Sequence, residues 1–490
     1  MKDGTLLAAV DLGSNSFRLE MGRLDHGQVL RVQYLKEPVR LGGGLDDSRN
    51  LTAGAMERGW QCLARFAEQL ASFGPAQVRA AATQTLREAR NRDAFLSRAQ
   101  EILGHPIDVI SGREEARLIY QGVAHLLPQS DEKRLVVDIG GRSTELILGQ
   151  GYRADVTESF RVGSVAWSMR YFPEGQFTAP AFERAEVAAQ AILDGALDIY
   201  TRERWEVAYG SSGTIGAVAD MLLASSQGQG EITPEGLAWL QRQLLLARSA
   251  DRLRLPGLKD DRRPVIGGGL SILRAVFSLL GVERMLAASG ALRHGLLYDL
   301  IDREQAESDV RGATIERLAV RFGVDRKQAR RVAQAAGHFL KQLLGSEEAR
   351  DAARQLTWAA QLHEVGIQVS HSDYHKHGAY ILDNTDAAGF SQQELHRLSL
   401  LVLGHRGKLR KLDADFDDEF FIQQLLCLRL AVILCHARRD AELRGLQLTR
   451  DGRALRLALP QAWGSSYPQS LHLLQQESVA WQKTPWSFTV

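Results

Sequence analysis

The chain has 490 residues, which is enough for about three domains. Apolar residues make up 44% and charged residues 24%, with a formal net charge of +1, so the composition is that of a globular protein. It lacks the overall basicity of a nucleic-acid binder, and we predict no nucleic-acid partner. The three cysteines are odd in number and scattered, which argues against a disulfide framework and predicts a reducing, cytoplasmic location.

The sequence also argues against membrane insertion. No uninterrupted apolar run approaches the roughly 18 residues that a spanning helix needs. The amino terminus, MKDGTLLAAVDLG, lacks the longer apolar core and the cleavage site of a signal peptide. We therefore predict neither a membrane span nor export.

The first part of the chain alternates strand and helix patterns. Two early strands are joined through the small-residue turn Gly13–Ser16, and a third follows the hairpin turn Asp25–Gly27. A helical pattern then ends at Gly74-Pro75. The remaining strand and helix patterns fall at residues 77–82, 92–103, 106–110 and 114–127.

The pattern starts again near Leu135. Aligning Asp138 with Asp11 also aligns three further pairs, which are Gly13 with Gly140, Ser16 with Ser143 and Gly22 with Gly149. Two matched starts in α/β segments of similar length predict an internal duplication. We therefore predict an α/β protein with lobes at residues 1–130 and 131–303, a helical domain at 304–440 and a small β-containing module at 441–490.

Each duplicated hairpin has a strand that ends in an aspartate before a turn of small residues. Backbone N–H groups of such turns can approach an anion closely. An aspartate beside a phosphate site is explained if a divalent cation lies between them. The alternative is an ordinary hairpin in which aspartate favours the turn, but the duplication favours a phosphate site. Two further segments, 209–218 and 265–273, are predicted to be strand-to-helix turns of the same form.

The segment from Ile110 to Leu127 contains a candidate general base. Ser111 and Glu114 have the spacing of a helix cap, and Glu114 is also spaced to pair with Arg117. Glu115 instead begins the apolar face of the helix, where a carboxylate is costly without a partner or a function. The alternative is a surface glutamate favoured by the helix dipole. We expect Glu115 to take a proton from water.

These segments together resemble the exopolyphosphatase / guanosine pentaphosphate phosphohydrolase family within the actin-like ATPase superfamily. The resemblance covers most of the chain, with motifs in the family's order. These are AVDLGSNSFRL (9–19), ATQTLREARN (82–91), ISGREEARLIYQGV (110–123), VVDIGGRSTEL (136–146), YGSSGTIGA (209–217), SGALRHGLLYD (289–299) and a longer segment at 359–382. The implied fold is two duplicated actin-like (ribonuclease H-like) lobes, an all-α HD-like domain and a small C-terminal α+β module, as in the long members of the family.

The resemblance also implies an activity. It is the processive hydrolysis of terminal phosphate from inorganic polyphosphate, with Mg²⁺ or another divalent cation, often with K⁺, in a homodimer. Hydrolysis of guanosine pentaphosphate at its 5′ phosphates, alone or in addition, is the alternative. A non-catalytic polyphosphate- or alarmone-binding regulator is a third hypothesis, and a nucleotide-dependent kinase or ATPase with nucleotide at Gly267–Gly269 is a fourth.

By motif position, the resemblance assigns a role to individual residues. Glu115 corresponds to the catalytic base. Asp11, Asp138 and Glu145 correspond to carboxylates at the metal site. The phosphate contacts correspond to Ser14, Asn15, Ser16, Arg87, Gly140, Gly141, Arg142, Ser143, Thr144, Ser212, Gly213 and Thr214. For Arg87 or Arg90, a solvated helix face is an equal alternative.

Arg142 departs from the family pattern, which has a third glycine at this position. If the position needs a positive φ, arginine costs about 1 kcal/mol. Its guanidinium could instead meet phosphate, and the sequence leaves both alternatives open.

The helical domain resembles the HD phosphohydrolase fold. An HD metal site needs His-Asp, whereas this chain has His363-Glu364, with other histidines nearby in sequence. The altered dyad favours a disabled metal site. The basic segments 325–331 and 405–411 could line a channel for polyphosphate, or could be solvated faces.

Overall fold

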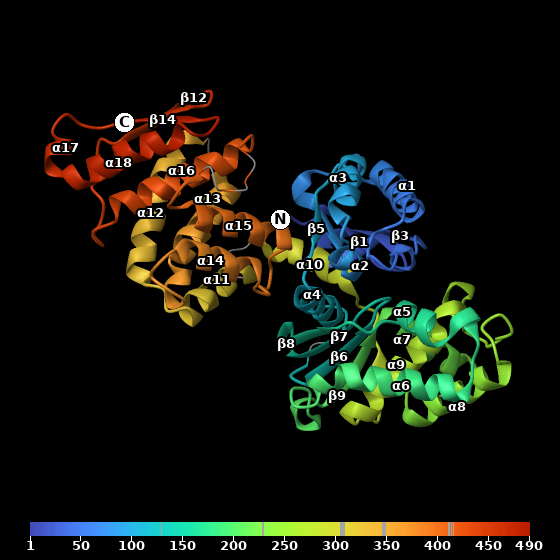
Figure 1. The fold of residues 1–490 in the computed structure, drawn as a ribbon. Coiled ribbons are helices and arrows are strands. Elements are labelled where there is room, and N and C mark those ends of the chain that lie inside the picture. The colour runs from blue at the N-terminus through green and yellow to red at the C-terminus, as the bar shows by residue number, and fades with distance from the viewer. Residues whose placement is uncertain are drawn as a thin grey trace. The chain divides into compact units, whose positions relative to one another are not determined.

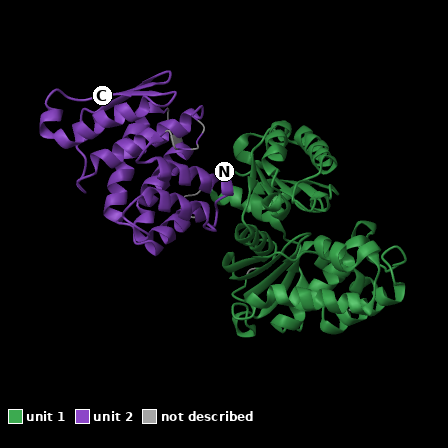
Figure 2. Ribbon diagram, in the orientation of Figure 1, with its two compact units in different colours: residues 1–308 green, residues 309–490 purple. Residues whose placement is uncertain are grey.

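The computed structural model describes residues 1–128, 130–227, 230–303, 309–344, 349–409, 412, 414 and 416–490. The chain divides into two compact units, residues 1–308 and 309–490, which we call the N-terminal and C-terminal units (Figure 2). Both predicted α/β lobes belong to the N-terminal unit, and the helical and terminal modules belong to the C-terminal unit.

The first lobe contains a five-stranded sheet with the order β3-β2-β1-β4-β5 (Figure 1). The first three strands form an antiparallel meander, whereas β4 and β5 run parallel to β1. We call β1, β2 and the turn between them the first hairpin. The strands are β1 (Leu6–Leu12), β2 (Phe17–Asp25), β3 (Gln28–Glu37), β4 (Val78–Ala82) and β5 (Ile107–Val109).

The second lobe repeats this topology and adds one edge strand, which gives the order β10-β11-β9-β6-β7-β8. We call β6, β7 and their turn the second hairpin. Even the register shift recurs, between Met21 and Gly22 in the first lobe and between Leu148 and Gly149 in the second. The predicted duplication is therefore confirmed. The strands are β6 (Lys133–Ile139), β7 (Thr144–Gln150), β8 (Arg153–Phe160), β9 (Val207–Ser211), β10 (Glu231–Ile232) and β11 (Met285–Ala287).

Two helices connect the lobes. Helix α4 (Gly112–Ala124) packs against β7 and β8 of the second lobe and against α10 (Leu292–Arg303), while α10 packs back on β1 and β4 of the first lobe. Figure 1 shows α4 between the two sheets. A core of buried apolar residues from both lobes surrounds these helices, including Ala81, Ile119 and Ile147. The helix that carries Glu115 is therefore held at the junction of the lobes.

The other helices of this unit pack on one lobe or the other, each lobe having its own buried core. In the first lobe they are α1 (Ala53–Leu70), α2 (Gln84–Glu88) and α3 (Arg92–Leu103). In the second they are α5 (Ser164–Tyr171), α6 (Ala179–Leu193), α7 (Ser212–Ala224), α8 (Pro234–Ala247) and α9 (Ile266–Leu280).

The predicted strand-to-helix turn at residues 265–273 is wrong. A 3₁₀ helix, Asp260–Val265, leads directly into α9, so Gly267–Gly269 lie within a helix. Their lack of side chains permits close packing, because a Cβ atom on Gly268 would lie 2.6 Å from the backbone nitrogen of Ser168. A glycine run alone cannot distinguish a turn from a packed helix.

One helical stretch, Asp260–Leu280, is long and apolar enough to cross a membrane by length and composition. The sequence expectation of no such segment rested on uninterrupted apolar runs, and this stretch begins with charged residues. Of the most apolar 18 residues of this stretch, 67% are buried inside the structure, as in the core helix of a globular lobe.

The C-terminal unit combines helices with a three-stranded sheet of order β12-β13-β14. The predicted short alternating strands near the end of the chain are confirmed as β12 and β13, which form an antiparallel pair. One buried core includes Phe339 and Leu426 of the helices together with Leu457 and Phe488 of the sheet. The helices are α11 (Val310–Arg321), α12 (Arg326–Leu343), α13 (Ala349–Leu362), α14 (Tyr374–Asp383), α15 (Gln392–Gly404), α16 (Glu419–Leu434), α17 (Trp463–Ser466) and α18 (Pro468–Trp481). The strands are β12 (Gln447–Asp451), β13 (Ala454–Ala458) and β14 (Ser487–Thr489).

Candidate active site

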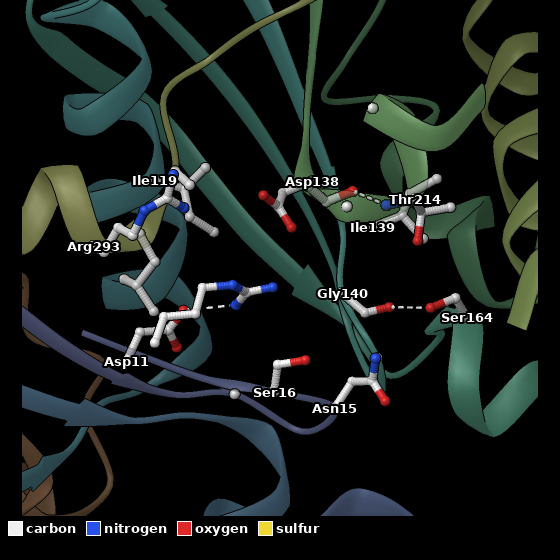
Figure 3. A pocket seen from close by; sticks show the side chains of 18 of the residues that line it. Asp11, Asn15, Ser16, Ile119, Asp138, Ile139, Gly140, Ser164, Thr214 and Arg293 are labelled. Atoms are coloured by element: carbon white, nitrogen blue, oxygen red, sulfur yellow. Dashed lines mark hydrogen bonds and ion pairs between the residues drawn. The ribbon is translucent and has the colours of Figure 1, made fainter. Parts of the chain in front are cut away.

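The two hairpins and α4 line one cavity of about 380 Å³ in the N-terminal unit. Asp11 and Asp138, at the ends of β1 and β6, and Glu115, in the first turn of α4, all belong to its wall. Figure 3 shows side chains of the first hairpin, such as Asp11 and Ser16, on one side and Asp138 of the second on another. The structure thus brings together the elements that the sequence predicts to share a site.

Most of the predicted phosphate contacts also line this cavity. They are Ser14, Asn15, Ser16, Gly140, Gly141, Ser143, Ser212, Gly213 and Thr214. The hydroxyl oxygen of Ser16 is buried and has no hydrogen-bond partner among the described residues, so it can bond to a ligand. In the second hairpin, the N–H groups of Ser164 and Val165 each donate at 2.9 Å to a carbonyl of the turn, which fixes its shape.

A third turn meets the cavity where β9 leads into α7. Ser212 begins the helix with a φ of 96°, a left-handed backbone that is strained for a non-glycine residue. Its hydroxyl oxygen accepts hydrogen bonds from the N–H groups of Thr214 and Ile215, at 3.2 and 3.3 Å. The positive end of the α7 dipole therefore points toward the cavity, where it favours an anion.

Four of the predicted site residues are not among the described residues that line the cavity. They are Arg87, Arg142, Thr144 and Glu145. The Thr144 hydroxyl is fully buried and donates to the carbonyl oxygen of Val162 at 2.6 Å, so its role as a phosphate contact stays a prediction. Arg142 does not have a positive φ, so the alternative in which arginine strains this position does not apply. Its guanidinium instead pairs with Glu88 at 2.7 Å.

Glu115 lies on the buried face of α4, as the apolar pattern predicts. The residue is 8% exposed, and Arg87 donates to its Oε2 at 2.8 Å. Burial raises the pKa of Glu115, although the charge and hydrogen bond of Arg87 oppose that rise. Its neighbour Glu114 is bound by Arg117 at 2.8 Å, the predicted helical pair. Glu115 is thus a buried carboxylate that faces the cavity with a raised affinity for a proton.

The carboxylates at the ends of the hairpins share a buried environment. Burial raises the pKa of Asp138 to about 6. Burial and the charges of Glu115 and Asp138 also raise the pKa of Glu145 well above its usual value. Asp11 is instead paired with Arg18 at 2.9 Å. Bringing a cation near Asp138 and Glu145 would relieve this accumulation of acidic groups.

The carboxylates fit a partly hydrated cation better than a protein cage. The Oε1 atom of Glu145 accepts a hydrogen bond from Ser159 at 2.8 Å, while its buried Oε2 has no partner among the described residues. The acidic oxygens of Asp11, Asp138 and Glu145 do not all lie within 4.8 Å of one another. Mg²⁺ commonly uses one or two carboxylates and completes its shell with phosphate and water.

Sequence reasoning missed the cations of the cavity wall. They are Arg18, Lys36, Lys259, Arg262 and Arg293. Arg18 lies directly opposite Asp11 in the first hairpin, so the pairing of the two predicted strands could have identified Arg18 from the sequence. The other cations come from β3, from the region before α9 and from α10, and no local pattern unites them. Figure 3 shows Arg293 beside the carboxylates of the site.

The histidines of the C-terminal unit pack closely. The rings of His363 and His405 lie 5.4 Å apart, and their Nδ1 atoms donate to the carbonyl oxygens of Ala360 and Val402. Glu364 pairs with Arg438 at 2.7 Å, so a cation engages the residue that replaces the aspartate of the HD dyad. Of the basic segment 405–411, Arg410 and Lys411 lie outside the described residues.

The chain matches the models of two protein domains along most of its length. Residues 23–304 match the Ppx/GppA phosphatase family, and residues 310–478 match its domain III. A protein of Pseudoalteromonas translucida (strain TAC 125), named guanosine-5′-triphosphate,3′-diphosphate pyrophosphatase, is 39% identical over 488 residues, which cover 99% of this chain and 98% of that protein.

Solved structures resemble the N-terminal part of the fold. An exopolyphosphatase-like protein is 25% identical, with a TM-score of 0.55, over 61% of this chain and 98% of that chain. An exopolyphosphatase from Cytophaga hutchinsonii has a TM-score of 0.56 and 23% identity over 61% of this chain and 98% of its own. The Ppx-GppA enzyme of Aquifex aeolicus has a TM-score of 0.51 and 24% identity, covering 60% of this chain and 99% of that one. These similarities agree with the predicted actin-like lobes.

Proposed function

Because the chain belongs to the Ppx/GppA phosphatase family and is thus a hydrolase of phosphoanhydride bonds, we propose that it removes the terminal phosphate from inorganic polyphosphate. The observation that supports this proposal is the single cavity in which two duplicated turns, the buried Glu115 and several cations meet. This combination suits a linear polyanion that must be held at one end while water attacks its last phosphorus atom.

The turns and the cations would hold the terminal phosphates. The turn at Gly140–Ser143 and the positive end of the α7 dipole would face the phosphates, and Arg18 and Arg293 add positive charge. Phosphoryl transfer depends mainly on such positioning and on charge stabilisation. Lys36, Lys259 and Arg262, which also line the cavity, would meet phosphates further along the chain. Retention of the shortened product by these contacts would give processive hydrolysis.

Glu115 would orient the attacking water and accept its proton. A carboxylate whose pKa is raised by burial is a better base near neutral pH than one in water. Arg87 would hold the carboxylate in position through its 2.8 Å hydrogen bond to Oε2. The proton leaves water as its oxygen bonds to the terminal phosphorus, and the bridging oxygen departs with the shortened chain.

A divalent cation such as Mg²⁺ fits the acidic side of the cavity. Asp138 and Asp11, which line the cavity, would hold it, the buried Glu145 would add a third acidic group close to Asp138, and the bound ion would neutralise charge on the phosphate oxygens. The unpartnered Oε2 of Glu145 and the raised pKa of Asp138 support this assignment. Arg87 would then serve Glu115 rather than contact phosphate itself.

Hydrolysis of guanosine pentaphosphate is the second candidate. The relative from Pseudoalteromonas translucida, similar over the full length of both chains, carries the name of that activity. The two substrates present the same terminal group, because each ends in phosphoanhydride-linked phosphates. The cavity chemistry described above serves both.

Phosphate release from both substrates tests the proposal. Polyphosphate of defined length and guanosine pentaphosphate would be compared at equal terminal-phosphate concentration, with and without Mg²⁺ and K⁺. We expect Mg²⁺-dependent release from polyphosphate without accumulation of intermediate lengths. A much larger kcat/KM for the nucleotide would favour the second candidate, and binding of both without release would favour a regulator. Sedimentation of the full chain would test the predicted homodimer.

A further inference from the structure

Arg142 of the second hairpin differs in its surroundings from its counterpart in the first hairpin. It aligns with Asn15 of the first hairpin, yet Asn15 lines the cavity and Arg142 does not. The Nε and Nη2 atoms of Arg142 donate to Oε2 of Glu88 at 3.0 and 2.7 Å, and Nη1 donates to the carbonyl oxygen of Gly42 at 3.1 Å. The arginine of the second lobe thus binds two elements of the first.

From Glu88, the hydrogen bonds continue toward α4, the helix that carries Glu115. Gln84 donates from Nε2 to Oε1 of Glu88 at 2.6 Å, and its Oε1 accepts from Nε and Nη2 of Arg87 at 3.0 and 2.7 Å. Arg87 then donates from Nη1 to Oε2 of Glu115 at 2.8 Å. An unbroken series of hydrogen bonds, which we call the Arg142–Glu115 relay, therefore joins the second phosphate turn to Glu115.

The relay is held at both ends by rigid backbone. A Cβ atom on Gly163 would lie only 2.3 Å from the backbone nitrogen of Arg142, so this glycine packs directly on the turn. At the other end, Arg87 also donates to the carbonyl oxygen of Ile110 at 2.9 Å, just before α4. Gln84 is 5% exposed, and the Arg142–Glu88 side chains are 21% and 14% exposed, so water competes little for these bonds.

We infer that Arg142 is a positioning residue that sets the orientation of Glu115 through Glu88, Gln84 and Arg87. The inference rests on the proposed function, because it takes Glu115 as the general base. Since the backbone of Arg142 belongs to a turn that would hold phosphate, a filled turn and a correctly oriented base favour each other. A glycine at position 142 could not form this connection.

A kinetic test separates positioning from direct phosphate binding. The single variants Arg142→Met and Gln84→Met, and the double variant, would be assayed with defined-length polyphosphate at saturating Mg²⁺. We expect each single variant to lower kcat about 3- to 30-fold, the range of coupling through such networks, with little change in KM. In the Gln84→Met background, Arg142→Met should have no further effect, because the relay is already broken.

The matched control is another partly buried ion pair of the second lobe. Arg274 and Glu186 lie 2.6 Å apart with 25% and 18% exposed side chains, and neither lines the cavity. Arg274→Met should leave kcat unchanged. Arg142→Lys keeps the charge and should restore part of the rate, and thermal unfolding of every variant would establish that each is folded.

Each other outcome overturns the inference in a recognisable way. A raised KM with unchanged kcat in Arg142→Met would mean that Arg142 contacts phosphate directly. Effects of Arg142→Met and Gln84→Met that multiply in the double variant would mean that the two residues act separately. Normal hydrolysis by Arg142→Met alongside a Glu115→Gln variant that has lost it would overturn the inference alone. A wild-type chain without hydrolysis would overturn the proposed function as well.

Discussion

The two hairpins share one backbone design but place opposite charges across from their aspartates. Both have the same strand pairing and the same turn length, and the second strand of each has the same register shift at a glycine where it pairs with the next strand. Opposite Asp11, however, the first hairpin places Arg18, whereas opposite Asp138 the second places Glu145. The first hairpin therefore neutralises its aspartate, and the second concentrates acid.

This difference suggests a division of labour between duplicated elements. The duplication gives two turns that can approach phosphate. The residue opposite the aspartate differs between the two hairpins, and we expect it to determine which further ligand each hairpin binds. We interpret the first hairpin as the polyanion-binding side and the second as the cation-binding side. In the proposed mechanism neither hairpin supplies the base, which would come from Glu115 on α4 between them.

The largest expected effect follows from that last point. Glu115→Gln removes the proton acceptor but leaves both hairpins intact, so hydrolysis should fall at least about 100-fold. Binding of polyphosphate, measured by isothermal titration, should change little. Glu101→Gln, at an exposed position on α3, is the control and should hydrolyse normally. A Glu115→Gln variant with wild-type turnover would remove Glu115 from the mechanism.

The second prediction uses a buried acid that only the first hairpin has. Glu20, aligned with the apolar Ile147 of the second hairpin, is 2% exposed. Burial favours its neutral form, but His294, Arg293 and Arg31 bind the ionised carboxylate and lower its pKa to about 2. Glu20→Gln should therefore reduce the free energy of unfolding by about 3 kcal/mol at pH 7.

The sign of the pH dependence follows from the lowered pKa. The stabilisation is fully present above the usual value of 4.5 and is lost as the pH falls toward about 2. Urea unfolding of wild type and Glu20→Gln at pH 7, 4 and 2.5 would measure the difference. A difference that grows as the solution becomes more acidic would contradict the assigned ion pairs.

The third prediction tests the opposite charges directly. Arg18→Gln should raise the KM for polyphosphate about 10-fold, because a charge-assisted contact in the cavity wall is lost. Glu145→Gln should instead raise the Mg²⁺ concentration for half-maximal rate about 10-fold. Rates measured over a grid of substrate and Mg²⁺ concentrations separate the two effects. Equal changes in the same parameter would remove the proposed division between the hairpins.

The sequence was sufficient for the features that repeat or that have a local signal. The duplication, the hairpins and the buried face of α4 were predicted because an Asp-x-Gly turn and an apolar stripe are local patterns. The histidine and glycine runs were less informative. The Gly267–Gly269 run, for example, could have formed a turn, but it packs within α9.

The rest of the site depends on tertiary contacts. Lys36 and Arg293 reach the same cavity from segments far apart in the sequence, and only the fold brings them together. Arg87 carried the right motif for a phosphate ligand, yet its guanidinium is engaged by Gln84 and Glu115. Residue type and spacing could not decide between phosphate and these side chains as partners of Arg87, because each offers a charged or polar oxygen.

The last prediction compares the glycines at the shared register shift. A Cβ atom on Gly149 would lie 2.5 Å from the carbonyl oxygen of Arg153 and 2.3 Å from the ring of Tyr120, whereas one on Gly22 would meet only the side chain of Val29 as closely. Backbone yields less than a side chain, so Gly149→Ala should destabilise the fold by about 1–3 kcal/mol and Gly22→Ala by less, in urea unfolding. Since Tyr120 lies on α4, Gly149→Ala should also lower kcat, and equal effects of both variants would mean that the second hairpin does not position α4.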